Sequence, residues 1–186
     1  MISFENAASG KLLISEPFMS DPNFKRSVVY LAEHNVRGTV GFVLNQKSGF
    51  LLSDLIDEFE NNEYQVYTGG PVGSDTLHFV HTLGHEIYDA VEVSKGVYWG
   101  GSFESLKVVF EKRQVLENEI KFFLGYSGWG TGQLELEIKQ NAWIVSDSKS
   151  EFIFADIEKQ LWNETVISLG EKFAPLVNFP ENPSLN

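Results

Sequence analysis

Three runs of apolar and β-branched residues near the start of the chain predict β-strands, at 11–15, 27–33 and 39–45. The uninterrupted apolar stretch from Val28 to Ala32 is typical of a strand that is buried on both faces. Residues 34–38 connect the second and third runs, and their number, with Gly38 at the end, predicts a hairpin loop. We therefore expect the second and third strands to pair in antiparallel fashion.

Hydrophobic spacing farther along the chain predicts further helices and strands. Apolar residues recur every three or four positions in the expected helices at 53–59, 103–112, 133–140 and 156–169. Short apolar or alternating runs predict strands at 65–68, 77–83, 90–93, 97–99, 120–126 and 142–145. Ser53 and Ser102 are the expected N-caps of the first two helices, and Gly170 is the expected stop of the last.

This order of elements predicts an α+β fold. Clustered strands followed by helix–strand alternation indicate one domain over residues 1–173, with a mixed, mostly antiparallel sheet or flattened barrel flanked by helices. A purely parallel sheet is disfavoured, because the hairpin and the closely spaced strands over 77–99 require antiparallel pairing. Pro175, Pro180 and Pro183 predict an extended tail over 174–186.

Composition narrows the class of protein. The chain has 186 residues, of which 42% are hydrophobic and 22% charged, as in an ordinary globular domain. Its apolar runs are far shorter than the roughly 18 to 20 residues of a membrane span. Glu5 stands where a signal peptide would carry Lys or Arg. We therefore predict a soluble cytoplasmic protein that does not associate with membranes.

Charge and cysteine content exclude further classes. The 14 Lys and Arg against 26 Asp and Glu give a formal net charge of −12. Direct nucleic-acid binding is not expected, because it depends on basic side chains at the phosphates. The chain has no cysteine, which excludes disulfides, thiolate nucleophiles and cysteine-ligated metals.

The histidines at positions 78, 81 and 85 have a spacing that would align metal ligands on one helix face. The segment reads as a strand, however, and on a strand His78 and His81 point to opposite faces. Three ordinary histidines are therefore favoured over a shared metal, and we predict neither a metal site nor a cofactor.

Glycines follow several of the predicted strands directly. Ser127 lies in a pattern close to a nucleophile elbow, but Trp129 replaces the final glycine, which argues against that role. Gly128, Gly130 and Gly132 could aim backbone N–H groups at an anion at the start of the following helix. The favoured alternative is a tight turn in which Trp129 fills the core.

Two further glycine pairs follow predicted strands, at 69–70 and 100–101. They could line a shared ligand cleft, although sharp turns that require glycine are the favoured interpretation. His34 is the candidate general base, with Asp21 or Asp75 to orient it. The competing interpretation makes Asn35 a turn residue that His34 merely flanks.

Five segments together resemble the YqgE/AlgH family of bacterial proteins. They are 10–15 (GKLLIS), 19–35 (MSDPNFKRSVVYLAEHN), 41–45 (GFVLN), 69–72 (GGPV) and 125–135 (GYSGWGTGQLE). The resemblance runs in order from about residue 10 to residue 170. It implies a bacterial, cytoplasmic α+β protein without an established reaction, of which some members are labelled transcriptional regulators.

Two departures from the family pattern matter. Family members often carry Cys where this chain has Ala32, so thiol chemistry cannot be a general function that this protein shares. The family loop usually has Ala where this chain has Ser127, which further weakens the case for a serine nucleophile.

Our leading functional hypothesis is a regulatory or binding protein with a glycine-edged cleft for a small polar ligand or a protein partner. The residues predicted to line that cleft are Arg26, His34, Asn35, Gly70, Gly128, Trp129 and Gly130. The first alternative is a hydrolase or phosphoryl-transfer enzyme that uses His34 as base. The second is a transcriptional regulator that acts without direct contact to DNA.

Overall fold

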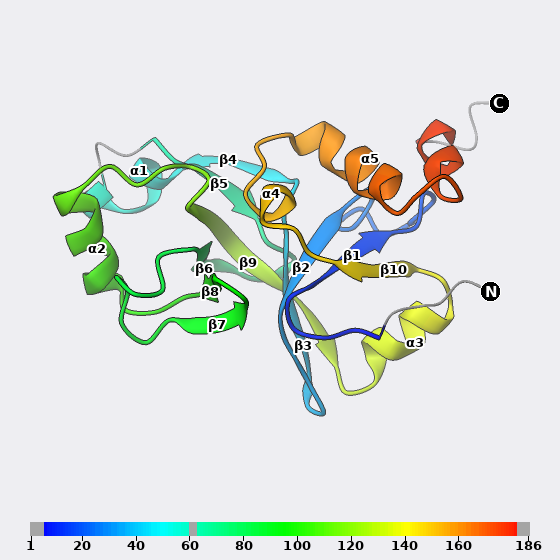
Figure 1. Ribbon diagram of the computed structural model, residues 1–186, viewed down its shortest axis with the longest axis horizontal. Helices are drawn as coiled ribbons and strands as arrows, with labels where there is room; N and C mark the ends of the chain where they lie inside the picture. Colours follow the sequence, from blue (N-terminus) through cyan, green and yellow to red (C-terminus); the bar gives the residue numbers. More distant parts are fainter. Residues whose placement is uncertain (1–5, 60–62, 182–186) are drawn as a thin grey trace.

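A computed structural model describes residues 6–59 and 63–181, and over these residues the chain forms a ten-stranded sheet with helices packed around it (Figure 1). The strands are β1 (Lys11–Ser15), β2 (Val28–Asn35), β3 (Gly38–Val43), β4 (Lys47–Leu51), β5 (Gln65–Thr68), β6 (Val72–His81), β7 (Val91–Ser94), β8 (Val97–Trp99), β9 (Ile120–Gly130) and β10 (Trp143–Asp147). The helices are α1 (Leu52–Leu55), α2 (Phe103–Lys112), α3 (Gln133–Lys139), α4 (Ser150–Ile153) and α5 (Glu158–Ser168), with 3₁₀ turns η1 (Asp57–Phe59) and η2 (Ala174–Asn178). None of the helices described is long and apolar enough to cross a membrane.

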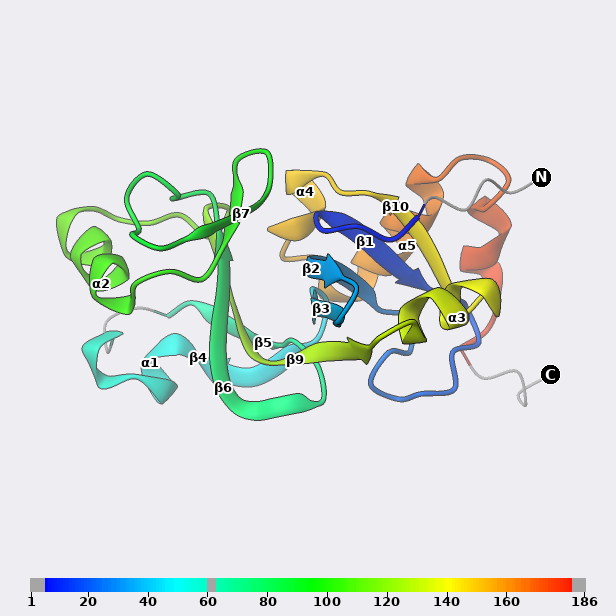
Figure 2. The same ribbon diagram turned by 90° about the horizontal axis from the view of Figure 1, so that it is seen from below.

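The strand order is β10-β1-β2-β3-β9-β6-β8-β7, and β5 joins β9 while β4 joins β5. Only the β5–β9 pair is parallel among the described strands, and the other pairs are antiparallel. The sheet curls into a half-barrel with the helices around it (Figure 2). The expected α+β class, with a mixed and mostly antiparallel sheet, is confirmed.

The long strand β9 joins the two halves of the molecule. Its first part pairs with β5 and β6, and its last part pairs with β3. Figure 1 shows β4 to β8, α1 and α2 at the left, toward the start of this strand, and β1, β2, β10, α3 and α5 at the right, toward its end. Successive side chains of β9 point to opposite faces of the sheet and belong to different hydrophobic clusters. Phe123 packs in the cluster with Tyr67 and Trp162, and Phe122 in the cluster with Val66 and Leu106.

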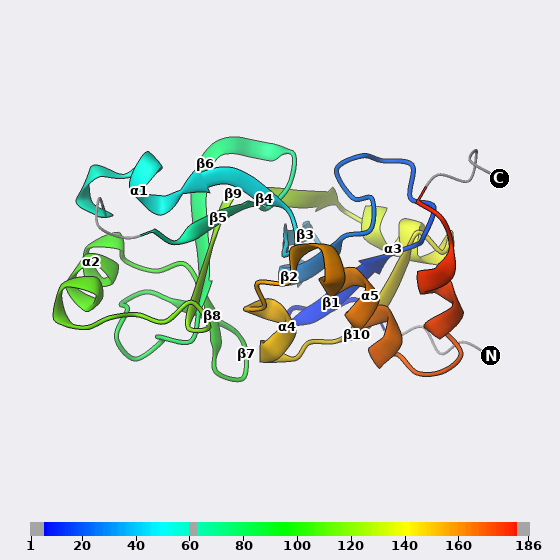
Figure 3. The same cartoon turned by 90° about the horizontal axis from the view of Figure 1, so that it is seen from above.

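Helix α5 packs on one face of β1 and β2 (Figure 3). It buries Leu161, Trp162 and Val166 against the sheet, at 1%, 1% and 0% exposure. The indole Nε1 of Trp162 donates to the carbonyl of Ser15 from 2.9 Å, which satisfies the one polar atom of that buried ring. These contacts fix the chain that enters α5, and that chain carries part of the site described below.

The structure differs from the sequence-based expectations at several elements. The strand expected at 120–126 continues to Gly130, because Gly128 and Gly130 pair with Val40 and Gly38 of β3. These glycines are thus in a strand rather than in a loop that leads into a helix. Strand β4 was not expected, because its sequence KSGFL contains Gly49 and no alternation of apolar and polar residues. In the structure most of its residues are exposed.

Two helical boundaries also differ. Helix α1 begins at Leu52 with Leu51 at the N-cap position, where Ser53 was expected to cap it. Residues 174–178 form the 3₁₀ turn η2 instead of an extended segment, because Pro175 stands at its start and Leu176 and Val177 pack on the core. The prediction for 182–186 lies outside the described residues.

Candidate functional site

A lysine is buried in the middle of the molecule. Lys121 lies on β9, on the same face as Phe123, and only 4% of it is exposed. Its Nζ donates a hydrogen bond of 2.8 Å to the carbonyl of Ala155. A buried lysine is unusual because the ammonium group loses its hydration, so the groups around this amine decide its chemistry.

The nearest aromatic ring belongs to Tyr67 on β5, the strand that runs parallel to β9. The Nζ of Lys121 lies 3.9 Å from the centre of that ring. The hydroxyl of Tyr67 donates to Oδ1 of Asp156 from 2.8 Å. Tyr67 therefore contacts the amine with its face and the carboxylate with its edge.

Asp156 lies in the short connection between α4 and α5, and it also forms an ion pair with Lys47 of β4. The Nζ of Lys47 is 2.9 Å from Oδ1 of Asp156. The backbone N–H of Lys47 donates to Oε1 of Glu158, at the start of α5, from 2.9 Å. Together with the Lys121–Ala155 bond, these contacts attach the α4–α5 connection to β4, β5 and β9.

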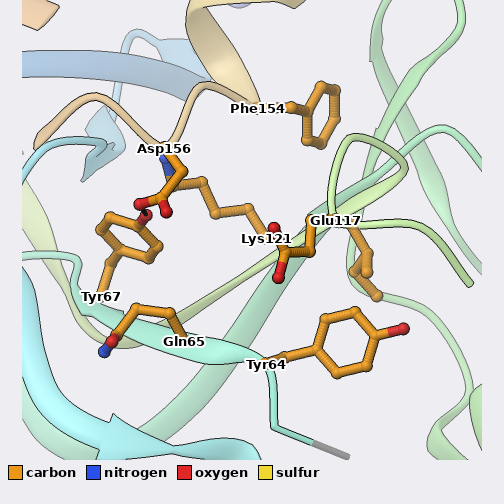
Figure 4. A pocket seen from close by; sticks show the side chains of 8 residues that line it. Tyr64, Gln65, Tyr67, Glu117, Lys121, Phe154 and Asp156 are labelled. Carbon is orange, nitrogen blue, oxygen red and sulfur yellow. Dashed lines mark hydrogen bonds between the residues drawn. The ribbon is translucent and has the colours of Figure 1, made fainter.

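A cavity of about 40 Å³ opens beside the Lys121 side chain (Figure 4). It is lined by Tyr64, Gln65, Tyr67, Glu117, Ile120, Lys121, Phe154 and Asp156. A wider surface hollow of about 680 Å³ shares Tyr64 and Glu117 with the cavity. The surface hollow therefore adjoins the cavity that Lys121 lines.

Burial sets the protonation of the site. It lowers the pKa of Lys121 to about 7, while the negative charges of Asp156 and Glu158 oppose this shift and the positive charge of Lys47 adds to it. Hydrogen bonds from Lys47 and Tyr67 lower the pKa of Asp156. Burial, followed by the hydrogen bond to Asp156, raises the pKa of Tyr67 well above its ordinary value. At neutral pH the site thus combines a partly neutral amine, a neutral phenol and a carboxylate.

The histidine segment is divided between the two faces of β6. The ring of His78 packs at a tilt against Phe42, at 5.3 Å between ring centroids, whereas His81 is fully buried and its Nε2 lies 2.8 Å from the carbonyl of Gly100. Within the described ranges, no three His, Asp or Glu side chains gather as a metal-ligand set. Burial lowers the pKa of both histidines.

The structure brings His34 and Asn35 together at the end of the β2–β3 hairpin. The Nδ1 of His34 is 2.7 Å from Oγ1 of Thr39, and its Nε2 is 3.5 Å from Oε1 of Glu135. Glu135 therefore stands where Asp21 or Asp75 was expected. The Oδ1 of Asn35 accepts from the N–H of Arg37 at 2.8 Å, which is the turn role considered for Asn35.

Trp129, Gly128 and Gly130 lie on the adjoining part of β9, where Trp129 pairs with Thr39. The two glycines are exposed, but Trp129 is 5% exposed and stacks on Phe24 with ring centroids 5.9 Å apart. Trp129 thus fills the core, as the tight-turn interpretation expected of its side chain.

Arg26 and Gly70 are placed apart from this hairpin end. The guanidinium of Arg26 lies 4.8 Å from the centre of the Trp162 ring and donates to the carbonyl of Phe179. Gly70 is buried against the backbone of Tyr126. The seven residues therefore occupy three places, and their role in ligand binding stays a prediction.

The site residues predicted from the sequence do not include Lys121, Tyr67 or Asp156. A signal was present for the first: Lys121 interrupts the apolar run Ile120–Phe123, on the strand face that also carries the buried Phe123. A charged residue inside a strand that is buried on both faces is a candidate for a functional group. Asp156 gave no such signal, since it was read only as the first residue of a helix.

The curled, mostly antiparallel sheet with helices packed around it defines a small α+β protein, in which Lys121 lies buried beside a cavity. The chain belongs to the AlgH-like family, whose model matches residues 12–174. This confirms the resemblance inferred from the sequence segments.

Relatives of this chain are found in several bacteria. A UPF0301 protein of Chlorobium limicola is 41% identical over 183 residues, which cover 98% of this chain and 98% of the relative. A UPF0301 protein of Bacteroides fragilis is 41% identical over 178 residues, which cover 95% of this chain and 90% of the relative. The match thus extends over nearly the whole length of each protein.

Two solved structures share the fold. The solution structure of the AlgH protein from Pseudomonas aeruginosa matches with a TM-score of 0.74 and 26% identity, covering 97% of this chain and 96% of that one. The crystal structure of protein DIP2367 from Corynebacterium diphtheriae matches with a TM-score of 0.80 and 21% identity, covering 96% and 95%.

Proposed function

We propose that this protein is a small-ligand-binding protein of the cytoplasm with a regulatory output, and that the cavity at Lys121 is its ligand site. The observation that carries this proposal is the position of Lys121, an amine that is 4% exposed yet lines a cavity next to a surface hollow. Asp156 and Tyr67 add an acceptor and an aromatic face to the same small space. Ligand sites commonly combine a concave apolar space with a few convergent polar groups.

The energetic cost of the buried lysine supports a role beyond packing. Burial disfavours the ammonium form, so Lys121 weakens the fold at neutral and acidic pH relative to an apolar side chain of similar size. Groups whose pKa is shifted by burial and a specific charge partner concentrate at functional sites. The attachment of the α4–α5 connection through Ala155 offers a means to transmit occupancy, because a ligand at the amine competes for that hydrogen bond.

A thermal-shift screen tests the site. The purified chain is screened against nucleotides, phosphorylated metabolites, divalent metals and small carbonyl compounds. A ligand at 100 times its dissociation constant stabilises by about 2.7 kcal/mol, which raises Tm by about 5 to 10 °C for a domain of this size.

Lys121→Met should abolish the shift, and Lys139→Met, at an exposed position of α3, should retain it. NMR signals of Tyr67 should move with the same ligand. A ligand that shifts both variants equally and leaves Tyr67 unchanged would show that the site lies elsewhere.

The His34–Glu135 pair favours a second candidate, an enzyme with His34 as general base. A carboxylate oxygen 3.5 Å from Nε2 is a geometry that can orient and charge-stabilise the ring. The candidate predicts turnover that falls by orders of magnitude in His34→Ala. A hydrolase assay in which His34→Ala equals the parent chain would remove it.

The regulatory output is proposed to act without direct contact to nucleic acid. The net charge of −12 opposes binding to phosphates. A protein partner would then read the ligand-bound state. Affinity for duplex DNA that falls steeply with salt would contradict this part of the proposal.

A further inference from the structure

The amine of Lys121 has the surroundings of a group that can form a covalent bond with a carbonyl compound. One N–H of Nζ is held by the Ala155 carbonyl at 2.8 Å, which orients the group, and the cavity adjoins the side chain. We propose that Nζ of Lys121 captures a small, uncharged aldehyde as an imine inside this cavity. This inference rests on the proposed function, because it names the chemistry of the same ligand site.

The size of the cavity limits the aldehyde. A water molecule needs roughly 10 to 15 Å³ of such space, so about 40 Å³ holds roughly three atoms the size of water oxygen. An aldehyde of two carbons has three heavy atoms and fits this space. The rings of Tyr64, Tyr67 and Phe154 line the cavity and suit a short alkyl group.

The charges around the cavity favour an uncharged aldehyde over a keto acid. Glu117 and Asp156 line the cavity, and Glu158 also acts electrostatically on Lys121. Lys47 supplies one opposing positive charge, which is paired with Asp156 at 2.9 Å. A carboxylate on the ligand would be repelled by the acidic groups, whereas a neutral aldehyde would not.

The reaction needs no oxidant or reductant. The nitrogen lone pair of the neutral amine attacks the carbonyl carbon and forms a C–N bond as the C=O π bond opens, and one proton passes from nitrogen to the oxygen to give a carbinolamine. The C–O bond then breaks, the oxygen leaves as water with the second proton of the nitrogen, and the C=N bond of the imine forms. The carboxylate of Asp156, which favours positive charge on Nζ, stabilises the protonated imine.

Protonation supports this chemistry. Burial lowers the pKa of Lys121 to about 7, against the ordinary value of 10.5. A large share of this amine is therefore neutral near pH 7, while exposed lysines remain almost fully protonated. Desolvation is one of the ways in which proteins activate a lysine for Schiff-base formation.

Reductive trapping tests the inference on the folded full-length chain. The chain is incubated near neutral pH with acetaldehyde and cyanoborohydride, which reduces an imine to a stable secondary amine, and the modified lysines are mapped by mass spectrometry. Lys121 should be ethylated at least about 10-fold faster than the exposed Lys139 and Lys149, because its neutral fraction is larger. Labelling of Lys121 that is no faster than that of the exposed lysines would overturn the inference.

Two comparisons make the test specific. Benzaldehyde is too large for the cavity, so its preference for Lys121 over Lys139 should be at least about 10-fold below that of acetaldehyde. Equal preferences would overturn the assignment of a small aldehyde. The variant Lys139→Met should leave the labelling of Lys121 unchanged.

The inference and the proposed function fail separately. If Lys121 is not trapped but a ligand still stabilises the chain in a manner that Lys121→Met abolishes, imine formation is excluded and the binding site stands. If Lys121 is not trapped and no ligand effect depends on it, both are overturned.

Discussion

The Nζ of Lys121 lies 3.9 Å from the centre of the Tyr67 ring, on two strands that run parallel. The ring covers the amine on the side of the hydrophobic cluster that contains Phe123, and the Tyr67 hydroxyl binds Asp156 at its far edge. The amine thus lies against an aromatic face in the interior, while a carboxylate remains near enough to act on its charge. The pKa of Lys121 therefore depends on the fold, and the stability of the fold depends in turn on the protonation of Lys121.

We expect Lys121 to make stability rise with pH. Its pKa is about 7 in the folded chain and near 10.5 when unfolded, so between these values the unfolded chain binds more protons. The free energy of unfolding of the parent chain minus that of Lys121→Met should increase by up to about 1.4 kcal/mol per pH unit between about pH 7 and pH 10. Urea titrations at several pH values measure it.

Below about pH 7 the same difference should be constant, because Lys121 is charged in both states. Lys139→Met, at an exposed position, should show no such slope. A flat difference for Lys121→Met from neutral to alkaline pH would mean that the amine is solvated like a surface lysine.

Removing the charge of Asp156 should lower the pKa of Lys121 further. Asp156 is the first of the acidic groups that oppose the effect of burial on this amine. In Asp156→Asn the amide oxygen can still accept from Tyr67, so the charge is lost while that hydrogen bond is kept. NMR titration of lysine side chains should give a Lys121 pKa below about 7 in the variant.

Glu164→Gln is a matched control, because it removes an exposed carboxylate of α5 that does not act on Lys121. An unchanged Lys121 pKa in Asp156→Asn, or an equal decrease in both variants, would contradict the assigned role of Asp156.

Much of the sheet could be predicted from the sequence, because hydrophobic runs such as Val28 to Ala32 identify buried strands directly. Strand β4 could not, since its pairing with β5 depends on register rather than on a hydrophobic pattern of its own. The extension of β9 to Gly130 could not be predicted from the sequence for a related reason. Glycine reads as a turn residue, and only the neighbouring strand β3 makes it part of the sheet.

The candidate site was harder to predict from the sequence than the fold, because its residues come together only in the folded chain. Tyr67 and Asp156 are 89 positions apart, and Lys121 and Ala155 are 34 apart. The sequence-based site predictions rested on glycines and histidines, because the identity of these residues alone suggests a turn, an anion site, a base or a metal ligand. The chemistry of Lys121 arises from burial, and burial of a lysine cannot be read from its identity.

Glu137 should be important for stability through its hydrogen bonds rather than its charge. Its Oε2 accepts from the indole Nε1 of Trp129 at 2.9 Å and of Trp143 at 2.8 Å. Glu137→Leu leaves two largely buried N–H donors without a partner and should cost about 2 to 4 kcal/mol of unfolding free energy. Glu137→Gln keeps an acceptor oxygen and should cost less than about 1 kcal/mol. Urea denaturation followed by tryptophan fluorescence compares them, and equal losses would show that charge dominates.

The glycines predicted to line a cleft should differ in how much a larger side chain lowers the free energy of unfolding. Gly70 has a φ of +156°, and an added Cβ would overlap the backbone of Tyr126 and Ser127. Gly70→Ala should therefore cost about 3 kcal/mol or more, since backbone cannot move aside as a flexible side chain can. At Gly130 the nearest heavy atom to an added Cβ is Oε1 of Gln133, at 3.9 Å, so Gly130→Ala should change stability by less than about 1 kcal/mol.

This difference decides which variant can test the glycine-edged cleft. Any loss of binding in Gly70→Ala would be confounded by loss of folding, whereas Gly130→Ala and the bulkier Gly130→Val alter an exposed edge of β9. If a ligand that stabilises the parent chain also stabilises Gly130→Val equally but no longer stabilises Lys121→Met, the ligand site is the lysine cavity. The opposite pattern would assign binding to the hairpin end that carries His34 and Asn35, because Gly130 lies beside it through the pairing of β3 with β9.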